Sequence, residues 1–253
     1  MELQALVNWQ RKLIYYPGNP SYISYSRFKR QETWLNSGSY KLQGWCYENR
    51  HLANDDIVLY FGGNAEDVAH SLDFLSQLPC SKIYTFNYRG YGLSEGKPSQ
   101  IALYDDALSI YQFLTSEVSH PPKNIHIIGR SLGSAVATYL SSHKRVASVT
   151  LLTPIKSIEA IAKLLFPYLP ISLVLADKYR IIELANTTSS PMQMIIAGRD
   201  EIVPNDHSLA LYEAWGGRKH CVTIDQADHN NITAFDHCLN AMCGFLRGFH
   251  PSP

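Results

Sequence analysis

The sequence predicts an α/β fold: a mostly parallel central sheet with helices on both of its faces. From residue 56 onward, short apolar segments rich in β-branched residues alternate with longer segments of helical periodicity, the order typical of parallel sheets. One of the strands, at residues 125–128, runs into a glycine-containing turn and then into a helix-compatible segment. At 253 residues the chain is long enough to bury one large core, so we expect a single domain over residues 1–253.

Two elements are expected before the alternating part. Apolar residues recur at helical spacing over residues 2–14, which predicts an amphipathic helix that ends before Pro17. Its apolar face either packs on the body of the domain or makes peripheral contact with a membrane. Residues 28–48 alternate in polarity and contain turn residues at 36–38, so we expect a β-hairpin there.

The alternating part supplies the remaining strands and helices. Strands are expected at residues 57–61, 83–87, 125–128, 146–152, 192–197 and 220–224. Helices are expected at residues 65–78, 100–116, 205–215 and 231–249, and Ser99 is the expected N-cap of the second of these. The one interruption, at residues 154–190, is a helical, proline-containing insertion that we expect to form a small cap over the carboxyl ends of the strands.

Charge and cysteine content narrow the class of protein. Lysine plus arginine equals aspartate plus glutamate, at 22 each, so we expect no nucleic acid or other strongly charged partner. The five cysteines are odd in number and lack C-x-x-C spacing, which favours reduced thiols over disulfides or a zinc site. There is no signal-peptide pattern, and the longest apolar stretch, residues 164–176, is too short and too interrupted by proline to span a bilayer. We therefore expect a cytoplasmic protein without a transmembrane segment.

The turn after residues 125–128 reads Gly129-Arg130-Ser131-Leu132-Gly133, a G-x-S-x-G pattern between a strand and a helix. This is the context of a nucleophile elbow, in which the turn is so tight that positions two residues before and after the serine must lack bulk. Ser131 is therefore the candidate nucleophile. By itself it would also fit an ordinary turn serine.

A serine hydroxyl is a poor nucleophile unless a base takes its proton and a third group orients that base. In serine enzymes built on such sheets, an acid and then a histidine follow the serine, each on a loop after a strand. The loop after the second-last predicted strand supplies Asp200, with Glu201 as the neighbouring alternative. The loop after the last strand supplies His229, and the adjacent Asp228 is expected to be a solvated loop carboxylate. We predict that Asp200 is the acid and His229 the general base.

The negative charge of a tetrahedral intermediate requires preorganised N–H donors. The backbone N–H of Leu132, the residue after the candidate nucleophile, is the first expected donor. The loop after residues 57–61 reads Gly62-Gly63-Asn64-Ala65, in which two glycines let the main chain turn its amides inward. We predict the N–H of Asn64 as the second donor, with Gly63 as the second choice. Alternatively, the two glycines form only a tight strand-to-helix turn.

Together these motifs resemble the α/β-hydrolase superfamily, and within it the serine aminopeptidase-like hydrolases and the eukaryotic α/β-hydrolase-domain depalmitoylases. The matching segments extend from about residue 12 to residue 247 and include residues 63–65, 87–99, 129–133, 198–200 and 228–230. The resemblance implies an α/β-hydrolase fold and a serine hydrolase with Ser131, Asp200 and His229 as its triad. Gly62 stands where the family often has histidine, and Asn87 stands where it usually has aspartate.

The predicted function is hydrolysis of a small-molecule carboxylic ester or thioester through an acyl-serine intermediate, without a cofactor or metal. The strongly apolar part of the insertion, residues 164–175, either lines an acyl pocket or buries itself on the sheet. An amidase or peptidase with the same triad is the alternative. For that alternative the insertion offers Glu159, Asp177 and Glu183 as carboxylates to anchor a peptide amine, although each is expected to be a solvated residue.

A third interpretation is a nucleotide-binding or non-catalytic interaction protein. It rests on Gly90-Tyr91-Gly92, which follows a predicted strand as a dinucleotide fingerprint would. However, Glu95 stands where the third glycine of that fingerprint belongs, and Lys97-Pro98 delays the next helix. These departures make this interpretation a remote one.

Overall fold

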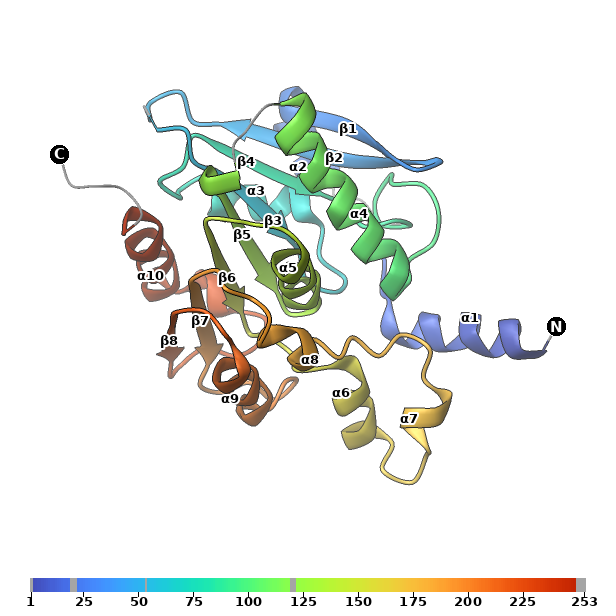
Figure 1. Cartoon of the computed structure of the whole chain (residues 1–253). Helices are drawn as coiled ribbons and strands as arrows, with labels where there is room; N and C mark the ends of the chain where they lie inside the picture. Colours follow the sequence, from blue (N-terminus) through green and yellow to red (C-terminus); the bar gives the residue numbers. More distant parts are fainter. Residues whose placement is uncertain (1, 19–21, 53, 119–121, 249–253) are drawn as a thin grey trace.

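The structure is a computed structural model that describes residues 2–18, 22–52, 54–118 and 122–248. At its centre is an eight-stranded sheet in the order β1-β2-β4-β3-β5-β6-β7-β8 (Figure 1). The strands are β1 (Glu32–Ser37), β2 (Tyr40–Glu48), β3 (Ile57–Phe61), β4 (Lys82–Phe86), β5 (Ile125–Arg130), β6 (Ser148–Leu152), β7 (Met192–Ala197) and β8 (Lys219–Ile224). β2 is antiparallel to both of its neighbours, and the strands from β4 to β8 pair in parallel. The predicted α/β fold is confirmed.

Helices cover both faces of the sheet, as the continuous apolar strands require. Every residue of β3, β6 and β7 is buried, which is the pattern of strands that are covered on both sides. One face packs against α4 (Gln100–Gln112), α5 (Leu132–His143) and α9 (Asn205–Ala214), which stand in front of the sheet in Figure 1. The other face packs against α3 (Val68–Leu75) and α10 (Asp236–Arg247).

Capping and turn geometry explain where helix boundaries differ from the predicted ones. α3 begins at Val68, later than expected, because the Asp67 side chain accepts a hydrogen bond from the Ala69 N–H at 3.1 Å. Ser99 caps α4 as predicted, accepting from the Ala102 N–H at 3.1 Å, but α4 ends at Gln112 and continues as a π-helical turn. The last predicted helix is split into a 3-10 turn (Ile232–Ala234) and α10.

The insertion after β6 contains three short helices, α6 (Ile158–Leu165), α7 (Ile171–Val174) and α8 (Ile182–Ala185). The N-terminal helix α1 (Glu2–Ile14), where the sequence predicts it, lies on the same side of the molecule as α6 and α7 (Figure 1). The Gln10 side chain joins the two segments, because its amide nitrogen donates to the Val174 carbonyl at 2.7 Å and its oxygen accepts from the Ala176 N–H at 3.1 Å. Across the described residues, no helix combines the length and apolar character needed to cross a membrane.

Candidate active site

Ser131 lies at the turn between β5 and α5 with a backbone φ of +50°, a conformation that L residues seldom adopt. Steric contacts explain why the two flanking positions are glycine. A Cβ at Gly133 would lie 2.1 Å from the carbonyl oxygen of Phe61, and one at Gly129 would lie 2.4 Å from the carbonyl oxygen of Gly133. The chain therefore passes so close to β3 and to its own next turn that the G-x-S-x-G spacing is required by packing.

The structure brings Ser131, His229 and Asp200 into one hydrogen-bonded line. The Nε2 atom of His229 lies 2.9 Å from the Ser131 Oγ, and the Nδ1 atom lies 2.8 Å from the Asp200 Oδ2. The side chains of His229 and Asp200 are only 8% and 2% exposed. With Nδ1 protonated and donating to the carboxylate, Nε2 is left as the acceptor for the serine hydroxyl. The residues that the sequence predicts as nucleophile, base and acid therefore lie together.

Backbone amides hold Asp200 in place. Its Oδ1 accepts hydrogen bonds from the N–H groups of Ile202 at 3.0 Å and Val203 at 2.7 Å, which leaves Oδ2 for the histidine. The alternative acid, Glu201, is exposed. Asp228, expected to be a solvated loop carboxylate, is half-buried and also organises the histidine loop by accepting from the Asn230 N–H at 2.8 Å.

The two candidate oxyanion donors in the loop after β3, the N–H groups of Asn64 and Gly63, differ in their hydrogen bonding. The Gly63 N–H already donates to the Glu66 Oε2 at 2.6 Å, so it is occupied by an internal acceptor. The backbone N–H groups of Asn64 and Leu132 have no hydrogen-bond acceptor among the described residues, and both residues line the cavity next to Ser131. Asn64 is therefore better placed than Gly63 to receive a developing charge.

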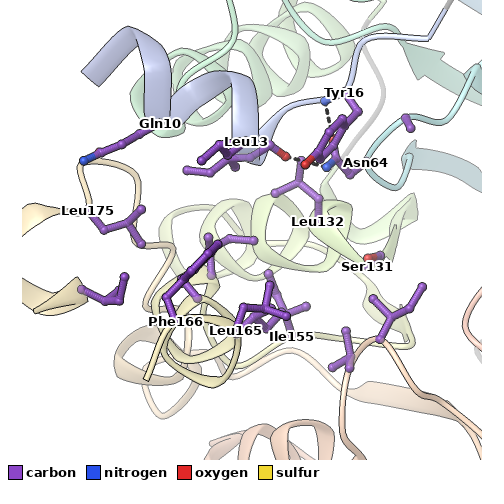
Figure 2. Close-up of a pocket in the computed structure, with 18 of the residues that line it drawn as sticks. Gln10, Leu13, Tyr16, Asn64, Ser131, Leu132, Ile155, Leu165, Phe166 and Leu175 are labelled. Atoms are coloured by element: carbon purple, nitrogen blue, oxygen red, sulfur yellow. Dashed lines mark hydrogen bonds between the residues drawn. The ribbon is translucent and has the colours of Figure 1, made fainter. Parts of the chain in front are cut away.

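The Asn64 side chain makes hydrogen bonds to residues outside the candidate oxyanion hole. Its Nδ2 donates to the Ile14 carbonyl at 2.5 Å, and its Oδ1 accepts from the Tyr16 N–H at 3.1 Å (Figure 2). The same Oδ1 also accepts from the Tyr91 hydroxyl at 2.7 Å. These bonds fix the end of α1 to the loop after β3.

Sequence reasoning missed two charged residues that connect the site's loops. Arg130 donates through Nη2 to the Asn230 carbonyl at 2.9 Å, and its Nη1 lies 3.4 Å from the Glu66 Oε2. Glu66 thus receives both this guanidinium and the Gly63 N–H, so one ion pair links the oxyanion loop to the histidine loop. The sequence did hold one signal for this contact: Arg130 is a charged residue between Gly129 and Ser131 of the elbow, at the end of a buried strand.

A cavity of about 440 Å³ lies over Ser131 and His229. Its walls are largely apolar and come from α1 and the insertion, with Leu13, Leu165, Phe166 and Leu175 around the space in Figure 2. The sequence left open whether the insertion lines a pocket or buries itself on the sheet. Most of the apolar side chains from 158 to 175 line the cavity, and some of these, such as Leu165 and Phe166, are also exposed at its mouth.

The carboxylates of the insertion have other partners. Asp177 accepts from Arg11 Nε and from the Tyr15 hydroxyl, both at 3.0 Å. Glu159 pairs with Arg180 and with Lys163. Neither carboxylate lines the cavity, nor does Glu183, so the anchor for a peptide amine is not supported.

The glycine loop behind the nucleotide-binding interpretation closes on itself. The Gly90 N–H donates to the Glu95 carbonyl at 3.2 Å instead of opening a helix. A Cβ at Gly92 would lie 2.1 Å from the Asn87 amide nitrogen, so this glycine is needed for packing. Asn87 itself is buried and donates to Gln43 Oε1 at 3.1 Å. No donor set for a metal ion, three or more His, Cys, Asp or Glu side chains together, occurs in the described part of the chain.

A serine presented at a strand–helix turn, on a sheet in which β2 alone of the described strands is reversed, defines a protein of the α/β-hydrolase class. Comparison with known proteins agrees with this class. The family model described as "alpha/beta hydrolase fold" matches residues 61–170. An uncharacterized protein of Mycobacterium tuberculosis is 31% identical over 245 residues, covering 94% of this chain and 87% of that protein. The chain belongs to the α/β-hydrolase family, and the resemblance seen in the sequence is confirmed.

Two further comparisons give one relative by sequence and one similar fold. The mouse alpha/beta hydrolase domain-containing protein 17C is 30% identical over 193 residues, which are 75% of this chain and 59% of that protein. The esterase Pf2001 of Pyrococcus furiosus superposes with a TM-score of 0.69 at 20% identity, covering 92% of this chain and 97% of the esterase. Family and fold together support a hydrolase.

Proposed function

We propose that this protein is a serine hydrolase that cleaves carboxylic esters or thioesters of apolar acyl groups through an acyl-serine intermediate. The observation that carries the proposal is the pair of contacts from His229 to Ser131 Oγ (2.9 Å) and to Asp200 Oδ2 (2.8 Å) at the base of an apolar cavity. The family relationship supports the same reaction class.

In the proposed mechanism His229 Nε2 takes the hydroxyl proton as the Ser131 Oγ attacks the acyl carbon. The carbonyl oxygen, now negative, accepts hydrogen bonds from the backbone N–H groups of Asn64 and Leu132. Asp200 orients the ring and stabilises the imidazolium. His229 then donates the proton to the departing alkoxide or thiolate, which leaves an acyl-serine.

Deacylation repeats these steps with water as the nucleophile. His229 takes a proton from the water as it attacks the acyl carbon, and returns that proton to the Ser131 Oγ when the acid is released. Apart from the substrate and this water, every group that the two half-reactions use belongs to the chain.

The cavity supports the class of acyl group. At about 440 Å³ it lies within the roughly 300–1,000 Å³ that ligand pockets usually span. Its lining offers apolar side chains such as Ile155 and Leu165 in the same cavity as the serine, and this suits the hydrocarbon part of an acyl chain. The insertion's carboxylates are engaged elsewhere, so an ester or thioester fits this site better than a peptide does.

The decisive experiment replaces Ser131 with alanine. Turnover of short p-nitrophenyl acyl esters should fall by about 1,000-fold or more, and labelling by a fluorophosphonate probe should disappear. Ser142→Ala, on the same helix but remote from the cavity, is the matched control and should keep wild-type turnover. Undiminished activity or labelling in the Ser131 variant would contradict the assignment of Ser131 as the nucleophile.

Acyl length is tested with the wild-type protein. Across p-nitrophenyl esters from two to eight carbons, kcat/KM should rise as more apolar surface enters the cavity. A steady fall with increasing length would refute the assignment of the cavity to acyl chains. A matched panel of ester, thioester and amide with one acyl group then ranks the three bond types.

A further inference from the structure

Exposed apolar side chains are concentrated at the mouth of the cavity. Of the eighteen large apolar side chains that are exposed in the described residues, ten belong to residues 9–16 and 164–174. Tyr168 is 98% exposed, Leu173 85% and Leu165 68%. We call the exposed apolar side chains of these two segments the rim surface. Contiguous apolar patches of this kind mark interaction sites on otherwise water-exposed proteins.

The rim surface is continuous with the cavity. Trp9, Leu13, Leu165, Phe166 and Val174 are exposed and also line the cavity. Their helices, α1, α6 and α7, project on one side of the molecule (Figure 1), and Figure 2 shows α1 on one side of the cavity with Leu165 and Phe166 across from it. An apolar chain held against the rim surface can therefore reach the serine without crossing water.

The charges around this surface are predominantly positive. Lys12, Lys163 and Arg180 are exposed in or next to the two segments, and the last two are paired with Glu159. Over residues 7–18 and 158–180 the acidic side chains are Glu159 and Asp177, each 5% exposed and each held in an ion pair with a cation of the same segments. These residues hold five cations (Arg11, Lys12, Lys163, Lys178 and Arg180) against the two acids, so this face has a net positive charge of 5 − 2 = +3, although the whole chain has a formal net charge of zero.

We propose that the rim surface docks on an anionic lipid bilayer, so that acyl substrates enter the cavity directly from the membrane. Apolar side chains ringed by Lys and Arg are the composition that binds the interface of anionic membranes. A second copy of the chain fits less well, because a two-fold contact would set positive charges against positive charges. The docking stands on the surface alone, whereas substrate entry from the bilayer rests on the proposed hydrolase function.

Vesicle co-sedimentation tests the docking independently of catalysis. The full chain carrying Ser131→Ala should bind vesicles of phosphatidylcholine and phosphatidylserine (3:1), and should bind vesicles of phosphatidylcholine alone much more weakly. The rim variant adds Leu164→Ser, Tyr168→Ser and Leu173→Ser, three exposed positions that do not line the cavity. Its partition onto the anionic vesicles should fall by about tenfold or more.

The matched control adds Ile101→Ser and Leu209→Ser, exposed apolar positions on α4 and α9, and should bind as the parent does. Thermal unfolding midpoints, which surface substitutions hardly change, verify that all variants are folded. Failure of the parent to bind anionic vesicles, or equal binding by the rim variant, overturns the proposal. Gel filtration that shows a dimer lost only in the rim variant also overturns it, in favour of a second copy.

A final arm separates docking from function. In the Ser131-intact background, the rim substitutions should lower hydrolysis of a long-chain acyl ester embedded in the anionic vesicles by about the same factor as binding. If the protein binds the anionic vesicles but Ser131→Ala leaves hydrolysis intact, the proposed function is wrong while the docking proposal holds. If Ser131 is essential but embedded ester is cleaved equally by the rim variant, delivery from the membrane is wrong.

Discussion

Replacing Glu66 with alanine tests whether a buried carboxylate holds the oxyanion loop in its working position. The Glu66 carboxylate accepts from the Gly63 N–H and the Tyr60 hydroxyl, each at 2.6 Å, and lies 3.4 Å from Arg130 Nη1. The side chain is only 10% exposed, so water does not readily replace it. Alanine would leave the Gly63 N–H without its acceptor and the Arg130 guanidinium without its carboxylate.

The magnitude follows from those bonds. A hydrogen bond to a charged group contributes about 1.5–3 kcal/mol, and each 1.4 kcal/mol corresponds to a factor of ten. If loss of one such bond is transmitted to the position of the Asn64 amide, kcat should fall by about 10–100-fold. KM for a small ester should change little, because Glu66 does not line the cavity.

The assay is kcat and KM on p-nitrophenyl acetate, together with the thermal unfolding midpoint. Glu66→Gln is the conservative control, because its amide oxygen can still accept from Gly63 while the Tyr60 hydroxyl turns to accept from the amide. It should recover most of the lost kcat. An alanine variant whose kcat stays within about twofold of wild type, while its unfolding midpoint falls, would refute the positioning role and leave Glu66 a structural residue.

Three further outcomes are expected. Gln10→Ala removes the two hydrogen bonds that this side chain makes to the insertion, while the Arg11–Asp177 pair remains. KM for octanoyl esters should therefore rise several-fold while KM for acetyl esters stays constant, which steady-state kinetics with the two esters measures. The Arg180 guanidinium holds the pKa of Glu159 well below its usual range, so this pair stabilises the fold above about pH 4.5 and the stabilisation is lost as pH falls towards the lowered pKa. Urea unfolding between about pH 5 and pH 3 should therefore show a steeper loss in the wild type than in Glu159→Gln, and equal slopes would contradict the pairing. Burial raises the pKa values of the Cys80 and Cys238 thiols to about 12, so both should react with a disulfide reagent at pH 8 only as fast as the chain unfolds; rapid titration of these thiols would contradict their burial.

The fold and the line of three polar residues could be predicted because their causes are local. Strands such as β3 and β7 are buried on both faces, so they read as uninterrupted apolar runs. The elbow needs glycine at residues 129 and 133 for steric reasons, which leaves a short and recognisable motif. The positions of Asp200 and His229 follow from the strands that precede them, since both loops leave the same edge of the sheet.

The contacts that the sequence did not predict join loops that are far apart in the chain. Arg130 meets Glu66 across 64 residues and the Asn230 carbonyl across 100 residues. Nothing in the local pattern of either loop specifies such a pairing. The order of Asn64 before Gly63 was already the prediction from the sequence, and the structure adds a local reason for it, because Glu66 turns back to occupy the Gly63 N–H.

The N-terminal helix is built into the oxyanion loop as well as into the wall of the cavity. Asn64 donates to the Ile14 carbonyl and accepts from the Tyr16 N–H, so it satisfies two backbone groups that the end of α1 would otherwise leave unpaired. The next residue, Ala65, has a φ of +61°, an unfavourable backbone conformation for alanine that needs such surrounding bonds to persist. Because Gln10 fixes the same helix to the insertion, the segments that form the rim surface also help to set the amide that would face the developing oxyanion. α1 therefore supports the loop that carries Asn64 and also forms part of the cavity wall. Removal of α1 should disturb the position of the Asn64 amide in addition to uncovering the cavity.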